Sequence, residues 1–314
     1  MSTLTNLIAF IISIASLFEP ASETDYYTEF GREDLSELIV TLEDELDRLA
    51  DYNMVDGTKF VLTFEDDFDG DALDRNVWTG HYSPYGGTSV IRRGGYWNSE
   101  LARVEDGKLI IPLIYSKDGM DGGGPGWYTV GLDTDGEGDS EGFQQAYGYF
   151  EVRCILPPCP GWAAFWLSNN QMGHVGDKGR DGMEIDIFES LYYTYGKNNM
   201  VVSNLHYDGY GPNLHTYKGR PFPVEGDPYS EFNVYALEWN EKEYTFYING
   251  EETFHTSFGG VCRNPEYLLL SLEVAGKDGV CAPDIDESRE YDFIVDYVRV
   301  YQYRALTEAA DSAA

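Results

Sequence analysis

Short apolar runs separated by turn-forming residues dominate the chain after Asn53. They are KFVLTFEDDF, GKLIIPLIY, YGYFEVRCIL, GWAAFWL, YTFYINGEETF, YLLLSLEV and FIVDYVRVYQY. Runs of this length between Gly, Asp and Asn, with tight-turn pairs such as Asn249-Gly250, predict strands joined by hairpins. We therefore expect an all-β fold, built as an antiparallel β-sandwich.

The first fifty residues follow a different pattern. Residues 7–18, LIAFIISIASLF, form one apolar run that is short for a bilayer span but suits the core of a secretory signal. No Lys or Arg precedes this run and no A-x-A site follows it, so a short buried helix is the alternative. From Asp34 to Asp51, Leu and Ile recur every three or four residues, which predicts an amphipathic helix.

These patterns divide the chain into four parts. We expect a signal peptide or apolar helix over 1–24, a helical extension over 25–56, a β-domain over 57–304 and a tail over 305–314. A signal peptide implies a secreted protein, and a buried helix leaves a cytoplasmic one as the alternative.

One predicted strand, GMEIDIFES at residues 182–190, carries three carboxylates among buried-type residues. Successive side chains of a strand alternate between faces, so Glu184 and Asp186 share one face while Glu189 is out of phase. One extra residue near Ile187 and Phe188, a β-bulge, would turn Glu189 onto that same face. The spacing then suits a pair of glycosidase carboxylates, and an edge strand with a solvated acidic face is the alternative.

Composition narrows the class of partner. The formal net charge is -34, from 55 acidic and 21 basic residues, which argues against nucleic acid and anionic membranes. Aromatic residues make up 15% of the chain and suit a β-core or a ligand platform. Cys154, Cys159, Cys262 and Cys281 have no C-x-x-C spacing, so they predict two disulfides or four buried thiols rather than a zinc or redox motif.

The bulged E-x-D-x-x-E strand resembles the signature of glycoside hydrolase family 16. Other segments resemble that family in the same order, over about residues 59–303: FEDDFDGDALDRNVW, YGYFEVRCILP, GWAAFWL, YALEWNEKEYTFYING and VDYVRVYQY. The resemblance implies a β-jelly roll with a concave cleft, and an enzyme that cleaves glycosidic bonds with retention of configuration.

The resemblance also implies roles for the three carboxylates. Glu184 would be the nucleophile, and Glu189 would be the acid that later acts as base. Asp186 between them would hold Glu184 and help to keep one carboxyl charged and the other protonated.

Five further side chains are candidates for substrate binding. Trp162 and Trp166 alternate onto one face of GWAAFWL, where they would stack on sugars or, alternatively, fill the core. Asn98 and Arg153 resemble family positions that contact sugar hydroxyls, although a strand arginine also pairs readily with a neighbouring acid. His206, on the strand after the acidic one, would reach the substrate beside Glu189 or serve a structural role.

Metal chemistry is not expected in catalysis. His206 and His215 lack a third ligand at zinc-like spacing. The resemblance implies a structural calcium on the convex side, for which Asp67, Gly107 and Asp296 occupy the corresponding positions.

The predicted function is endo-hydrolysis of β-1,3- or mixed β-1,3/1,4-glucan, and the predicted partner is a polysaccharide bound by a monomer without a stable membrane span. The extra residue in the motif resembles laminarinases and agarases more than lichenases, and the negative charge disfavours anionic galactans. The alternatives are a galactan hydrolase of the agarase or carrageenase type, a transglycosylase, and a non-catalytic polysaccharide-binding module.

Overall fold

The structure, a computed structural model, describes residues 55–136, 142–190 and 199–313. The apolar run at 7–18 and the amphipathic helix at 34–51 lie outside the described residues, so both stay predictions. Within the described residues, no helix has the length and apolar character that crossing a membrane requires.

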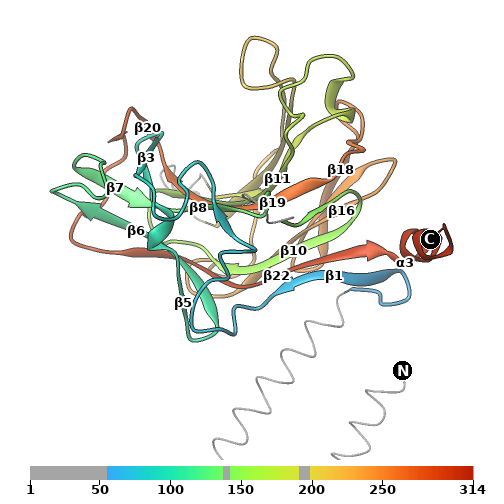
Figure 1. Cartoon of the computed structure of the whole chain (residues 1–314), viewed down its shortest axis with the longest axis horizontal. Coiled ribbons are helices and arrows are strands. Elements are labelled where there is room, and N and C mark those ends of the chain that lie inside the picture. Colours follow the sequence, from blue (N-terminus) through green and yellow to red (C-terminus); the bar gives the residue numbers. More distant parts are fainter. Residues whose placement is uncertain (1–54, 137–141, 191–198, 314) are drawn as a thin grey trace, which may run out of the picture. The chain divides into compact units, whose positions relative to one another are not determined.

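Two large antiparallel sheets form the β-domain, as the sequence predicts (Figure 1). In order, the larger sheet contains β18 (Glu251–Thr256), β17 (Tyr244–Ile248), β16 (Asn233–Trp239), β10 (Gly148–Ile155), β22 (Tyr291–Tyr303), β6 (Lys108–Ser116), β7 (Gly126–Thr129), β4 (Gly95–Trp97) and β3 (Val90–Arg92), with β1 (Phe60–Asp66) beside β22 and β5 (Arg103–Glu105) beside β6. The β4–β7 pair alone is parallel among the described strand pairs of this sheet.

The smaller sheet carries the acidic strand near its middle. In order it contains β14 (His215–Lys218), β13 (Met200–Tyr207), β12 (Glu184–Glu189), β11 (Gly161–Ser168), β19 (Glu266–Val274), β8 (Gly131–Asp133) and β2 (Thr79–Gly80), with β15 (Phe222–Pro223) beside β13 and β9 (Gln144–Gln145) beside β19. A separate hairpin pairs β20 (Gly276–Lys277) with β21 (Val280–Cys281), and two short 3-10 helices span Ser99–Leu101 and Lys178–Arg180. The acidic strand therefore has neighbours on both sides, which excludes the edge-strand alternative.

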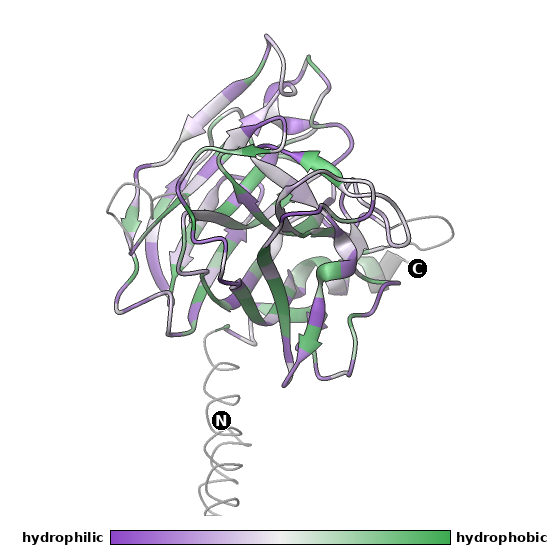
Figure 2. Ribbon diagram, turned by 90° about the vertical axis from the view of Figure 1, so that its left-hand side faces the viewer, coloured by the Kyte–Doolittle hydropathy of each residue, from purple (hydrophilic) through white to green (hydrophobic). Residues whose placement is uncertain are grey.

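Alternating side chains of β11 show how the sheet faces are used. Ala163, Phe165 and Leu167 belong to the main hydrophobic core between the sheets. Ala164 and Trp166 belong instead to a small apolar cluster on the opposite face. Hydrophobic and hydrophilic residues also alternate along several strands in Figure 2. The core fixes which face of each strand is left for a binding site.

The C-terminal tail and the cysteines add to what the sequence predicts. The predicted tail at 305–314 forms a helix, α3 (Arg304–Ala313), directly after β22. Its apolar residues are mostly alanines, which favour helix. All four cysteines are free thiols, so the disulfide alternative is wrong for this structure.

Candidate active site

The bulge predicted in the acidic strand is present in β12. Along β11, Phe165 lies opposite Phe188 and Trp166 lies opposite Asp186, so Ile187 is the extra residue. The register between β12 and β13 shifts between Asp186 and Glu189 as well. The bulge restores the phase of the strand, and all three carboxylates reach the same face.

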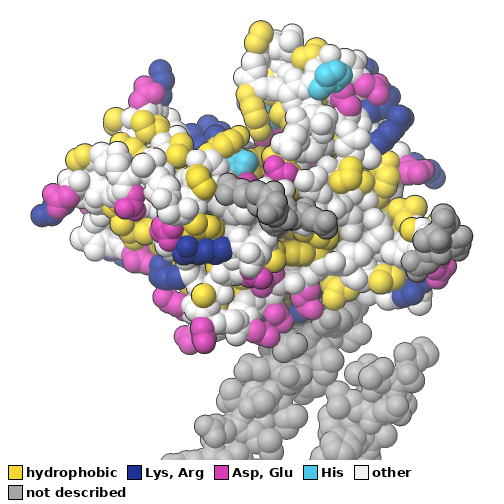
Figure 3. Space-filling model, in the orientation of Figure 1, with side chains coloured by type: hydrophobic (Ala, Val, Ile, Leu, Met, Phe, Trp, Pro, Cys, Tyr) yellow, Lys and Arg dark blue, Asp and Glu magenta, His cyan; other side chains and the backbone are white. Residues whose placement is uncertain are grey.

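That face forms the floor of a cleft of about 430 Å³. Figure 3 shows acidic side chains within the hollow between two raised parts of the molecule. The lining residues are Tyr82, Arg92, Arg93, Trp162, Ala164, Trp166, Glu184, Asp186, Glu189, Tyr210, Ser271 and Glu273.

Glu189 is held by two donors. The Trp162 indole Nε1–H donates to Glu189 Oε1 at 2.7 Å, and the Asn204 amide donates to Oε2. Burial, and then the charge of Asp186, raise the pKa of Glu189 well above its ordinary value, while the two hydrogen bonds oppose the rise. A carboxyl in this environment retains its proton toward neutral pH, as a general acid must.

Glu184 has a different environment. The Tyr210 hydroxyl donates to Glu184 Oε2, and His206 Nε2 lies 3.8 Å from Oε1. Burial raises the pKa of Glu184, but His206 and the Tyr210 hydrogen bond both favour the ionised form. The sequence analysis missed Tyr210, because it lies in a Gly- and Pro-containing loop that no strand pattern places.

Asp186 lies between the two glutamates and is the most deeply buried of the three. It is 4% exposed, and burial followed by the charge of Glu184 raises its pKa well above the ordinary value. Its Oδ2 atom has no hydrogen bond and lies 3.3 Å from His206 Nε2. The site therefore concentrates three buried carboxyl groups with raised pKa values on one floor.

Replacing Asp186 by Asn is expected to stabilise the fold at neutral pH. A carboxyl with a raised pKa in the folded state carries no penalty below its unfolded pKa of about 3.9, and the penalty grows as pH rises above that value. The expected gain is about 1 to 3 kcal/mol at pH 7, disappearing near pH 4. Denaturant unfolding at both pH values measures it, with the substitution of the exposed Asp118 by Asn as control. An equal gain at both pH values would contradict the electrostatic cause.

Two arginines and one acid complete one side of the cleft, and the sequence analysis missed all three. Arg92 Nε lies 2.6 Å from Glu273 Oε1, and Arg93 also pairs with Glu273. The Arg93 guanidinium lies over the Trp162 ring at 4.1 Å and holds the indole in place. Glu273 lies near the end of the apolar run YLLLSLEV. A single acid in an otherwise apolar strand was the sequence feature that could have marked it as a cleft residue.

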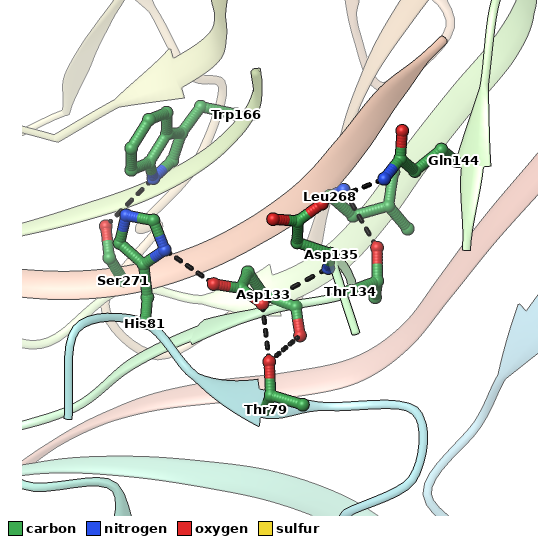
Figure 4. Close-up of polar contacts among 9 residues, drawn as sticks. All are labelled: Thr79, His81, Asp133, Thr134, Asp135, Gln144, Trp166, Leu268 and Ser271. Atoms are coloured by element: carbon green, nitrogen blue, oxygen red, sulfur yellow. Dashed lines mark hydrogen bonds and ion pairs between the residues drawn. The ribbon is translucent and has the colours of Figure 1, made fainter. Parts of the chain in front are cut away.

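A buried polar network lies behind Trp166 (Figure 4). The Trp166 Nε1–H donates to Ser271 Oγ at 3.1 Å, and the ring meets His81 edge-on with centroids 5.9 Å apart. His81 Nδ1 lies 2.5 Å from Asp133 Oδ2, and the Thr79 hydroxyl donates to the other oxygen of Asp133 at 2.6 Å. The network fixes the orientation of Trp166. Thr79 and Asp133 come from strands of 2 and 3 residues, which are too short for sequence patterns to place.

The structure does not bring Asn98 or Arg153 to the residues that line the cleft. Asn98 caps the 3-10 helix Ser99–Leu101 by accepting from the Glu100 N–H, and it donates to Asp121 at 2.6 Å. Arg153 is on β10 of the larger sheet and pairs with Asp296 at 2.6 Å. The neighbouring-acid alternative therefore accounts for Arg153, and the Asn98 amide is used in local structure.

The proposed calcium positions do not assemble a clear cation site. Asp296 lies on β22, and the β22–β6 register brings the turn containing Gly107 near it. The Arg153 guanidinium, however, occupies Asp296 Oδ2 at 2.6 Å, where it would repel a dication. This ion pair disfavours calcium at Asp296. The calcium site at Asp67, Gly107 and Asp296 stays a prediction.

His206 and His215 do not share a site. His206 is beside Glu184 and Asp186, whereas His215 lies 3.7 Å from Asp208 and stacks on Tyr207. The two histidines therefore do not form a zinc site together, and His206 contacts the carboxylates of β12 instead.

Buried carboxyl groups in unequal environments, beside two tryptophans that line the same cleft, are features expected of an enzyme that acts on polysaccharides. The model of the family described as Glycosyl hydrolases family 16 matches residues 116–258, which include all three carboxylates. Over these residues the chain is similar to this family.

Relatives and solved structures extend the similarity to most of the chain. The chain is 27% identical over 218 residues to the clotting factor G alpha subunit of Tachypleus tridentatus, covering 66% of this chain but only 29% of that protein. It is 26% identical over 258 residues to a β-glucanase of Rhodothermus marinus, covering 77% of this chain and 85% of that protein. Among solved structures, the catalytic domain of an endo-1,3-beta-glucanase (laminarinase) from Thermotoga petrophila RKU-1 superposes with a TM-score of 0.62 at 25% identity, covering 79% of this chain and 99% of that one.

Proposed function

We propose that the chain is an endo-acting, retaining glucanase that cleaves β-1,3- or mixed β-1,3/1,4-glucan. The observation that carries the proposal is the unequal environment of two glutamates on one face of β12. Burial raises the pKa of both glutamates, but His206 and the Tyr210 hydrogen bond oppose the rise at Glu184, whereas the charge of Asp186 adds to the rise at Glu189. A double displacement needs one ionised and one protonated carboxyl.

In this mechanism Glu184 attacks the anomeric carbon while Glu189 donates its proton to the leaving oxygen. The resulting glycosyl-enzyme is hydrolysed by water, from which Glu189 now removes a proton. Tyr210 would orient Glu184, and Trp162 would hold the carboxyl of Glu189 toward the bond that breaks.

The substrate assignment rests on the relatives and on the charge of the chain. The Rhodothermus marinus relative is named a β-glucanase, and the Thermotoga petrophila structure is described as a laminarinase. A chain with a formal net charge of -34 repels anionic galactans, and a neutral glucan avoids this penalty. A long, neutral polymer also suits secretion, which we propose from the apolar run at 7–18.

A substrate panel tests the proposal. We expect reducing ends to appear from laminarin or mixed-linkage glucan, with products of several lengths at early times because cleavage is internal. NMR of the first products should show the β-anomer before mutarotation. Release from agarose or carrageenan alone would replace the glucan by a galactan, and lengthened products would mark a transglycosylase. Binding to glucan without cleavage would identify a binding module.

A further inference from the structure

A histidine faces two of the acidic side chains in the cleft. His206 on β13 lies opposite Glu184 of β12 in the strand register. Its Nε2 atom is 3.3 Å from Asp186 Oδ2 and 3.8 Å from Glu184 Oε1, and the three ligand atoms lie within 4.8 Å of one another. We propose that Glu184, Asp186 and His206 bind a divalent transition-metal ion, with Zn²⁺ as the probe, and that the ion competes with substrate.

The spacing of the donor atoms fits such an ion. Tetrahedral Zn²⁺ with nitrogen and oxygen ligands at about 2.0 to 2.1 Å places its ligand atoms about 3.3 Å apart. The His206–Asp186 distance of 3.3 Å already has this value. Glu184 Oε1, at 3.8 Å from the imidazole, needs a shift of about half an ångström to reach the same spacing. Three protein ligands leave one position for water.

The imidazole is oriented as a ligand. His206 Nδ1 lies 2.9 Å from the Thr216 hydroxyl, and Thr216 is its direct partner on β14. When an ion is bound, Nδ1–H donates to this oxygen and the Nε2 lone pair faces the ion. Metal-bound histidines are usually fixed in this way through their second ring nitrogen.

Asp186 supplies an independent indication of a cation ligand. The residue is only 4% exposed, and its Oδ2 atom is buried without a hydrogen bond. A buried carboxylate oxygen is costly unless a proton, a donor or a metal compensates it. The nearby guanidinium groups of Arg92 and Arg93 form their ion pairs with Glu273 instead.

The site is distinctive within the part of the chain that the structure describes, because no other group of three His, Cys, Asp or Glu side chains there has ligand spacing. A mixed nitrogen and carboxylate set favours Zn²⁺, Cu²⁺ or Ni²⁺ over Ca²⁺ and Mg²⁺, which prefer oxygen alone. An ion held there would bond to the Glu184 oxygen that is needed for attack. This inhibitory consequence rests on the proposed function, whereas metal binding itself does not.

The test is calorimetric titration of the metal-stripped full chain with ZnCl₂ in a buffer that does not chelate zinc. We expect one site whose affinity falls at least tenfold in His206→Asn and in Asp186→Asn. His255→Asn is the matched control, because His255 is exposed and lies 2.8 Å from a single acid, Glu252. Circular dichroism confirms that each variant folds, and Asp186→Asn provides a second route if His206→Asn does not fold.

Equal affinity in the wild type and in folded His206→Asn or Asp186→Asn would overturn the proposal and assign binding to surface histidines. Loss of affinity in His255→Asn alone would overturn it in the same way. Zinc should also suppress glucan cleavage, with EDTA restoring it. If no glucan is cleaved, the proposed function fails while the titration still decides the metal site.

Discussion

Replacing Glu184 by Ala is expected to lower glucan cleavage by about 10⁴-fold or more, and added azide is expected to restore turnover of an activated aryl β-glucoside oligomer. Without the carboxylate, no covalent intermediate forms, and the cavity it leaves admits a small anion. Azide then attacks the anomeric carbon from the side that Glu184 occupied. The product is an α-glycosyl azide, which NMR distinguishes from the β-configured substrate.

The control for this experiment is Glu252→Ala, which removes an exposed glutamate of β18. It should retain full activity and give no azide product. A folded Glu184→Ala protein that cleaves glucan normally would remove Glu184 as nucleophile. A β-configured azide product would instead show attack on a covalent intermediate that still forms, which would make Glu184 the acid/base and place the nucleophile on another residue.

The sequence predicted the β-sandwich and the acidic strand because both depend on local patterns. Alternation along β11 places Trp162 and Trp166 on the same face, where both line the cleft. The bulge was predictable because strict alternation from Glu184 and Asp186 would point the Glu189 carboxylate into the hydrophobic core. In each case one strand contains the whole signal.

The missed residues depend on contacts between distant segments. Tyr210 reaches Glu184 from the loop after β13, and Arg92 meets Glu273 across 181 positions of sequence. Neither contact can be predicted from the hydrophobic periodicity or residue spacing of the segments that form it. For Arg153 the sequence left two alternatives open, a sugar contact implied by the family position and an ion pair with a neighbouring acid, and the structure shows the ion pair with Asp296.

Replacing Glu189 by Gln is expected to separate the two steps of the reaction. The sugar hydroxyl released from glucan is a poor leaving group unless it is protonated. Loss of the general acid should therefore lower glucan cleavage by about 10² to 10⁴-fold. An aryl glycoside with an acidic phenol needs little protonation, so its first step should remain fast. Because the introduced amide cannot activate water, the glycosyl-enzyme should accumulate, and intact mass spectrometry should detect it, with peptide mapping placing it on Glu184.

The pH profile gives an independent reading of the same substitution. In the wild type, cleavage requires ionised Glu184 and protonated Glu189, so activity rises with the deprotonation of the first and falls with that of the second. Burial raises both pKa values, which moves the active range toward neutral pH, and the rise is larger where Asp186 adds its charge to Glu189. Glutamine does not titrate, so Glu189→Gln should lose the alkaline limb and keep the acidic one. An unchanged alkaline limb would assign the acid to another group, and equal losses on glucan and the aryl glycoside would exclude a role in leaving-group protonation.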